Sequence, residues 1–216
     1  ASKVVALGFG DATQLSVTTS AAGAKSRQVF TTQPAITLLD SAGNKVADST
    51  LAVEAVVSGA TLGGTVSLAA VDGVATFTNL KLTGTSGSYT IEYLLAATTS
   101  VKTTQTIQLA FGTATKLSVS TQAAGFTNRV AFTTQPIVSV LDADGNLVTN
   151  STATIAVSSS TGNGAVLSGT KSIDATNGLV TFTDLKLTGL VGSYTLTFAS
   201  TGLTSATQTV TLLPAA

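Results

Sequence analysis

Short alternations of apolar and polar residues run along the whole chain, separated by clusters of glycine, asparagine, serine and aspartate. In residues 51–58, for example, one face of an extended strand carries Leu51, Val53, Ala55 and Val57, and the other carries Ala52, Glu54, Val56 and Ser58. This period of two predicts strands with one buried side, and no segment has the period and caps of a helix. In the first half of the chain we predict seven strands, at residues 13–18, 35–40, 51–58, 66–71, 74–80, 88–95 and 103–111.

The second half of the chain repeats the first. Four blocks recur in the same order, at residues 30–34 and 132–136, 39–44 and 141–146, 76–84 and 181–189, and 87–90 and 192–195. The two occurrences lie 102 residues apart for the first two blocks and 105 apart for the last two. The second repeat therefore contains a small loop insertion between its second and third blocks. Two homologous domains in tandem follow from this. We expect an N-terminal extension strand at 1–11, a first domain at 12–112 and a second at 113–216.

Seven short strands per repeat are typical of an all-β immunoglobulin-like sandwich. Residues 40–44 and 142–146 predict tight connections in which glycine and asparagine adopt positive φ. Tyr89 and Tyr194 each follow Gly-Ser at the start of a late strand. This is the place of the corner tyrosine of such sandwiches, whose hydroxyl bonds back to upstream backbone. The fold prediction is therefore two tandem immunoglobulin-like β-sandwiches.

Composition narrows the classes of function. The 216 residues include no Cys, His, Met or Trp, which excludes thiol and imidazole nucleophiles, histidine bases and thiolate or imidazole metal sites. Only 9% of the residues are charged and the net charge is zero, so the basic stripe that nucleic acid requires is missing. No stretch reaches the roughly 20 apolar residues of a membrane span. We expect no enzymatic activity, no cofactor, no nucleic-acid partner and no membrane insertion, and the weak charge favours association between copies.

The runs Ala-Thr-x-Leu-Ser-Val, Phe-Thr-Thr-Gln-Pro, Leu-Asp-x-x-Gly-Asn and Gly-Ser-Tyr-Thr resemble the bacterial immunoglobulin-like repeats of invasin-type surface proteins. The resemblance covers residues 12–213. It implies an extracellular or cell-surface location in a bacterium after removal of a signal peptide, and a first residue Ala1 suits such a mature form. It leaves the role open, since such repeats serve as stalks, adhesive tips, surface-layer units and spacers beside enzymes.

The first ten residues look like the closing strand of a further domain. Val5, Leu7 and Phe9 share one face of a strand and repeat the spacing of residues 107–111, the last strand of the first repeat. We predict that this segment adds to the distal domain of a neighbouring subunit, which would give head-to-tail polymers. The alternative is that residues 3–9 form the first strand of their own domain.

The second repeat already has a closing strand of its own. Val210 and Leu212 occupy in it the positions of Ile107 and Leu109. An incoming strand would have to add beside this strand or replace it, so we include both residues in the predicted subunit interface. The predicted function is an extracellular structural protein that assembles with copies of itself into a fibre or surface lattice. The alternative is a ligand-binding module of an adhesin, with a surface glycan or a protein as its partner.

Loop residues supply three weaker candidates. Asp142, Asp144 and Asn146 alternate oxygen ligands as a calcium loop does, but no bidentate glutamate follows and the first repeat has Ala42 at the middle position, so a plain hairpin turn is favoured. Asn150 begins a glycosylation sequon. The third candidate is a contact at residues 126–129, where an aromatic lies near a cation.

This third candidate is Phe126 with Arg129, which serves either as an interface anchor or as a cap over one end of the sandwich. Glu54 and Glu92 are the only glutamates, and two carboxylates on neighbouring strands are the groups that glycoside cleavage requires. Because no aromatic or acidic residues gather around them, we predict solvent-facing charges, with Glu92 opposite Lys102 across a hairpin.

Overall fold

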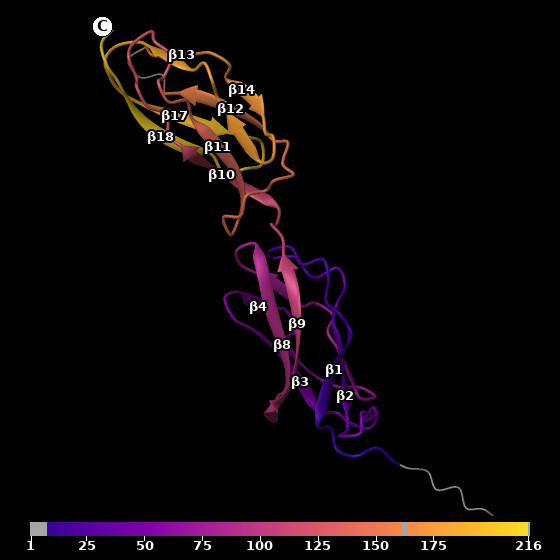
Figure 1. Cartoon of the computed structure of the whole chain (residues 1–216). Coiled ribbons are helices and arrows are strands. Elements are labelled where there is room, and N and C mark those ends of the chain that lie inside the picture. Colours follow the sequence, from indigo (N-terminus) through magenta and orange to yellow (C-terminus); the bar gives the residue numbers. More distant parts are fainter. Residues whose placement is uncertain (1–7, 161–163, 216) are drawn as a thin grey trace, which may run out of the picture. The chain divides into compact units, whose positions relative to one another are not determined.

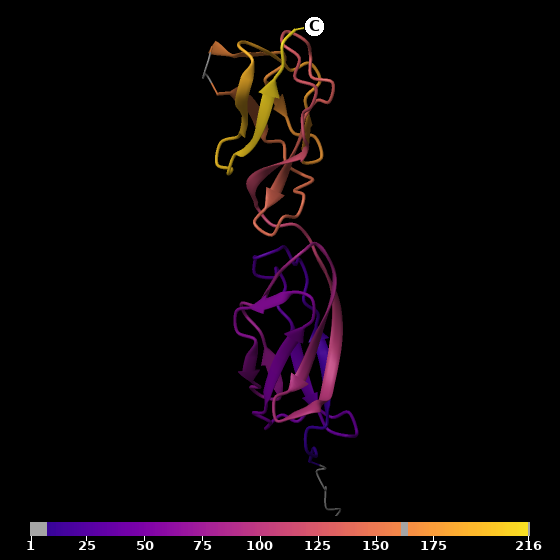
Figure 2. The same cartoon turned by 90° about the vertical axis from the view of Figure 1, so that its left-hand side faces the viewer.

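The structure is a computed structural model that describes residues 8–160 and 164–215. The chain divides into two compact units, Ala1–Phe111 and Gly112–Ala216, here called the first and second sandwich. Figures 1 and 2 show strands and connecting loops in both units. Among the described residues there is no helix with the length and hydrophobicity needed to span a membrane.

Between residues 8 and 111 the first sandwich contains nine strands. They are β1 (Gln14–Thr19), β2 (Ala35–Leu39), β3 (Ala52–Val57), β4 (Thr61–Gly63), β5 (Ser67–Ala69), β6 (Val74–Thr76), β7 (Lys81–Thr83), β8 (Gly87–Leu95) and β9 (Thr98–Leu109). A three-stranded sheet has the order β1-β2-β6, a four-stranded sheet has the order β5-β3-β8-β9, and β4 pairs with β7. All of these pairings are antiparallel.

The second sandwich repeats this plan. Its strands are β10 (Ala114–Thr121), β11 (Ile137–Asp142), β12 (Thr154–Ser159), β13 (Val166–Ser168), β14 (Ser172–Asp174), β15 (Leu179–Thr181), β16 (Lys186–Thr188), β17 (Gly192–Ala199) and β18 (Ala206–Leu212). The sheets are β10-β11-β15, β14-β12-β17-β18 and β13-β16. The fold class predicted from the sequence, two tandem all-β sandwiches, is therefore confirmed.

The predicted strands differ from the observed ones where strands are short. The alternation predicted no strand at β4 or β7, because each has three residues and too few positions to show a period. The segment predicted at 74–80 ends as a strand at Thr76, although Phe77 and Leu80 beyond it are buried. Phe77 and Leu80 are thus core residues that lie in the loop between β6 and β7.

Each sandwich is held together by aliphatic and aromatic side chains on the inner faces of its sheets. In the first sandwich the rings of Phe77 and Tyr93 lie 5.8 Å apart, and in the second those of Phe182 and Phe198 lie 5.7 Å apart. The predicted corner tyrosines are confirmed, since the hydroxyl of Tyr89 donates to the carbonyl of Thr85 at 2.7 Å. In the second sandwich Tyr194 donates to the carbonyl of Leu190 at 2.6 Å.

Candidate functional site

A single carboxylate holds the chain where it enters the first sandwich. Asp40 follows β2 and is 5% exposed. Its Oδ2 accepts a hydrogen bond from the amide of Gly10 at 3.1 Å and another from the side-chain amide of Asn44 at 3.1 Å. Its Oδ1 accepts the amides of Ala42 and Asn44 at 2.9 and 2.8 Å. Asp40 thus closes its own turn and also fixes a residue 30 positions earlier.

The second sandwich has the same arrangement. Asp142 is 1% exposed, and its Oδ2 accepts the amide of Gly112 at 2.7 Å and the side-chain amide of Asn146 at 2.8 Å. Its Oδ1 accepts the amides of Asp144 and Asn146, both at 2.9 Å. Gly112 follows the link between the two domains in sequence. The first sandwich therefore holds Gly10 in the same way as the second sandwich holds Gly112.

These N–H groups stabilise the ionised form of both carboxylates. The amide of Gly10, followed by the backbone and side-chain amides of Asn44, lowers the pKa of Asp40 to about 2. Burial acts to raise the pKa of Asp142, but the donors of Asn146 and Gly112 outweigh it and hold that pKa below its ordinary value. Both side chains are therefore charged and fully engaged at neutral pH.

The turns after these aspartates differ in one respect from the prediction. Gly43 and Gly145 have φ of 85° and 87°, as expected for glycine. Asn44 and Asn146 do not have positive φ. Instead, the side-chain amide of Asn44 donates to Asp40, and that of Asn146 donates to Asp142. Because N–H donors occupy both oxygens of Asp142, the geometry is that of a hydrogen-bonded turn. It gives the calcium hypothesis for Asp142, Asp144 and Asn146 no support.

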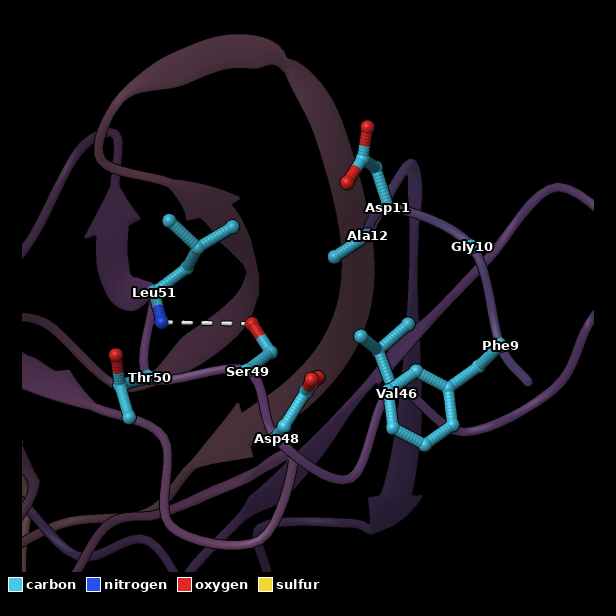
Figure 3. Close-up of a pocket in the computed structure, with 9 residues that line it drawn as sticks. All are labelled: Phe9, Gly10, Asp11, Ala12, Val46, Asp48, Ser49, Thr50 and Leu51. Atoms are coloured by element: carbon cyan, nitrogen blue, oxygen red, sulfur yellow. Dashed lines mark hydrogen bonds between the residues drawn. The ribbon is translucent and has the colours of Figure 1, made fainter.

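An open hollow of about 640 Å³ lies beside Gly10. Residues 9–12, Val46 and residues 48–51 line it, and we call it the start hollow. Figure 3 shows Phe9 and Val46 on one side of it and Leu51 on the other. Phe9 is 41% exposed and Leu51 42% exposed, so both offer apolar surface to the solvent. Two carboxylates, Asp11 and Asp48, also line it.

The residues predicted for the subunit interface fall in different places. Val5 and Leu7 lie outside the described residues, whereas Phe9 lines the start hollow. Val210 and Leu212 are 2% and 0% exposed, because they point into the core of their own sandwich from β18. An incoming strand would not reach these two side chains unless β18 moved.

The outer edge of β18 is partly covered by its own sandwich. The amide of Leu117 in β10 donates to the carbonyl of Thr204, and Thr127 bridges Leu213 in parallel. Between these points Gln208 donates from Nε2 to the carbonyl of Ala123 at 2.8 Å and accepts its amide at 2.9 Å. A strand that added along this edge would have to displace these contacts.

Three large apolar side chains are exposed together at the end of the second sandwich where β18 finishes. Leu190, Val191 and Leu213 are 67%, 56% and 52% exposed, and we call them the end patch. Gly192, which follows Val191, pairs with Leu212, so the turn 189–191 lies beside Leu213. The amino-acid sequence gives no signal for this patch, because isolated apolar residues in loops form no period.

Phe126 and Arg129 lie close to the end patch. The carbonyl of Phe126 accepts the amide of Leu213, and the amide of Arg129 donates to the carbonyl of Leu187. The ring of Phe126 packs edge-on against Phe132 at 4.9 Å between centroids, and it is half-buried. Phe126 thus lies over its own core, whereas Arg129 is exposed.

The remaining candidates are on the surface. Lys102 Nζ lies 3.0 Å from Glu92 Oε1 and both side chains are well exposed, as predicted, but Glu92 pairs with Thr104 and Lys102 with Leu94, so the contact runs diagonally across the hairpin. Such a pair contributes little stability. Asn150 of the sequon is exposed in the loop before β12. Within residues 8–160 and 164–215, no group of three acidic, histidine or cysteine side chains could hold a metal ion.

No family model and no curated protein matches the sequence. Solved structures with a similar fold include an Escherichia coli adhesin, FdeC, at 18% identity and a TM-score of 0.45, with 99% of this chain and 67% of that one covered. The D0-D1 domain of intimin is 18% identical with a TM-score of 0.31, over 94% of this chain and 98% of that one.

A β-glycosidase from Bacteroides vulgatus is also similar, at 13% identity and a TM-score of 0.41. The match covers 94% of this chain but only 25% of the enzyme, so the chain spans about a quarter of that glycosidase. None of these likenesses assigns an activity or a ligand to this chain.

Proposed function

We propose that this chain is a structural module of a bacterial surface protein and that it assembles head to tail through the segment that ends at Gly10. One observation carries the proposal. Asp40 holds Gly10 as Asp142 holds Gly112, and Gly112 is the residue at which one sandwich passes into the next. The start of the first sandwich is thus built to receive a preceding sandwich.

The sequence before Gly10 supports the same reading. In β9 the side chains of Ile107 and Leu109 are 6% and 3% exposed, and Val5 and Leu7 stand at the same spacing before the Phe-Gly pair. A segment with this pattern buries its apolar face when it closes a sandwich. Contact between the start of one copy and the end of another is heterologous and does not close on itself, so it propagates into a filament or lattice.

Size in solution tests the proposal. Sedimentation velocity and negative-stain microscopy of the chain over a wide concentration range should show species larger than one chain. Deletion of residues 1–9 should reduce them to monomers while circular dichroism and the unfolding transition of the second sandwich stay unchanged. Monomers alone at every concentration would contradict the proposal and favour the adhesin alternative.

A further inference from the structure

We propose that the end patch of one chain seats in the start hollow of another. This inference rests on the head-to-tail assembly proposed above, and it names the two surfaces that meet. The patch consists of Leu190, Val191 and Leu213, and the hollow is the one flanked by Phe9, Val46 and Leu51.

Two residues of the end patch lie in a turn whose equivalent in the first sandwich has no large apolar side chains. In the first sandwich the turn after β7 reads Gly84-Thr-Ser-Gly87, and in the second the turn after β16 reads Gly189-Leu-Val-Gly192. The tyrosine hydroxyl binds the first central carbonyl in both turns. Since the polar pair supports the same turn, the fold does not require Leu190 and Val191.

The third residue of the patch shows the same contrast. Leu213 bridges Thr127 in parallel, and the corresponding residue in the first sandwich is Ala110, which bridges Lys25. Large apolar side chains have thus replaced small or polar ones at all three positions of this end. Leaving three adjacent apolar side chains in water is unfavourable, which indicates a surface that is covered by a partner.

The start hollow offers a matching apolar surface. Phe9 and Leu51 are each about two-fifths exposed on its opposite sides, and Val46 lies beside Phe9. In the second sandwich the position of Leu51 is taken by Ala153. The large apolar side chain on this side of the hollow is therefore specific to the first sandwich, as the end patch is specific to the second, whereas Phe9 and Val46 have the apolar counterparts Phe111 and Val148.

The charges of the two surfaces are complementary. Asp11 and Asp48 line the start hollow, and the corresponding residues of the second sandwich, Thr113 and Asn150, are uncharged. Arg129 is exposed beside the end patch. Opposite charges around an apolar contact favour one pairing and register over others.

The position of the link also brings these surfaces together. Leu109 at the end of β9 pairs with Gly87, so the residues that lead to the next sandwich leave the first one beside the turn 84–86. In the second sandwich the strand in this position is β18, whose last residue, Leu212, pairs with Gly192 beside the turn 189–191. A following copy that continued from this end as the second sandwich continues from β9 would bring its start hollow, which begins at Phe9, against Leu190 and Val191.

Two complementary variants of the full chain test the pairing. Leu190→Thr with Val191→Ser installs the turn of the first sandwich and removes the patch. Leu51→Asp places a charge in the hollow. Each variant should associate at least about tenfold more weakly than the wild type, because an apolar contact is lost. Val71→Thr is the matched control, since Val71 is 73% exposed in a different turn and its replacement should change nothing.

Mixing the two variants is the decisive measurement. Each keeps one intact surface, so an equimolar mixture should form dimers with one joint and stop there, as measured by sedimentation velocity. A mixture that stays monomeric would show that these surfaces are not partners. If deletion of residues 1–9 abolishes association but the patch variant associates like wild type, the head-to-tail function holds and this inference fails.

Discussion

The amide of Gly112 donates to Oδ2 of Asp142 at 2.7 Å, a hydrogen bond across 30 residues that fixes the chain where it enters the second sandwich. The same bond joins Gly10 to Asp40 in the first sandwich. In both sandwiches one carboxylate accepts hydrogen bonds from the amides of its own turn and from an amide 30 residues earlier in the chain. Loss of this side chain therefore affects the turn and the link together.

Asp142→Ala should destabilise the second sandwich by about 2 kcal/mol or more, because four N–H donors lose a charged acceptor and several of them are buried. Calorimetric or denaturant unfolding should show one of two transitions shifted and the other unchanged. Lys171→Ala is the control, since that side chain is exposed in the second sandwich and its loss should shift neither transition. A shift no larger than the control's would contradict the role given to Asp142.

Acid should weaken the first sandwich through Asp40. Since its folded-state pKa is lowered to about 2 from 3.8, the carboxylate stabilises the fold fully above pH 3.8 and loses this contribution as the pH falls through 2. Asp40→Asn should be less stable than wild type at neutral pH and should lose less stability between pH 4 and 2. Thermal unfolding measured across this range checks the prediction, and parallel curves for the two proteins would contradict it.

The hydroxyl of Tyr93 is buried and finds no hydrogen-bond partner among the residues that the structure describes, and its burial raises its pKa. Phe198 fills the equivalent position in the second sandwich. Tyr93→Phe should therefore keep or raise stability, by up to about 1 kcal/mol, and the reciprocal Phe198→Tyr should cost about 1–3 kcal/mol. Denaturant unfolding of both variants measures this. A marked loss for Tyr93→Phe would point to a partner for that hydroxyl.

Gln208 ties residue Ala123 to the edge of β18 through two hydrogen bonds. Gln208→Ala should destabilise the second sandwich by about 1–3 kcal/mol, because the amide and carbonyl of Ala123 lose their partner. It should also increase exchange of the β18 amides with solvent, which hydrogen exchange can resolve. Gln208→Glu tests the geometry, since it keeps the acceptor for the Ala123 amide but loses the donor. Unchanged exchange in the alanine variant would show that the edge is covered by other means.

The amino-acid sequence by itself determined the architecture. Alternation in segments such as residues 51–58 predicted strands because a half-buried strand must place apolar side chains at every second position, and Val53 and Ala55 are indeed buried. The recurrence of whole blocks predicted two domains, and the Gly-Ser-Tyr runs predicted the tyrosine bonds that Tyr89 and Tyr194 make. These features depend on neighbours along the chain, which a single sequence displays.

Only the tertiary structure decided which distant groups meet. Asp40 was predicted to shape a turn, but its bond to Gly10 depends on how β1 and β2 bring residues 30 positions apart together. Leu190, Val191 and Leu213 come from a turn and a strand end, and nothing in their spacing predicts a shared surface. Strands fold by local pattern, whereas a site arises where loops from several strands converge, and such convergence leaves no period in the sequence.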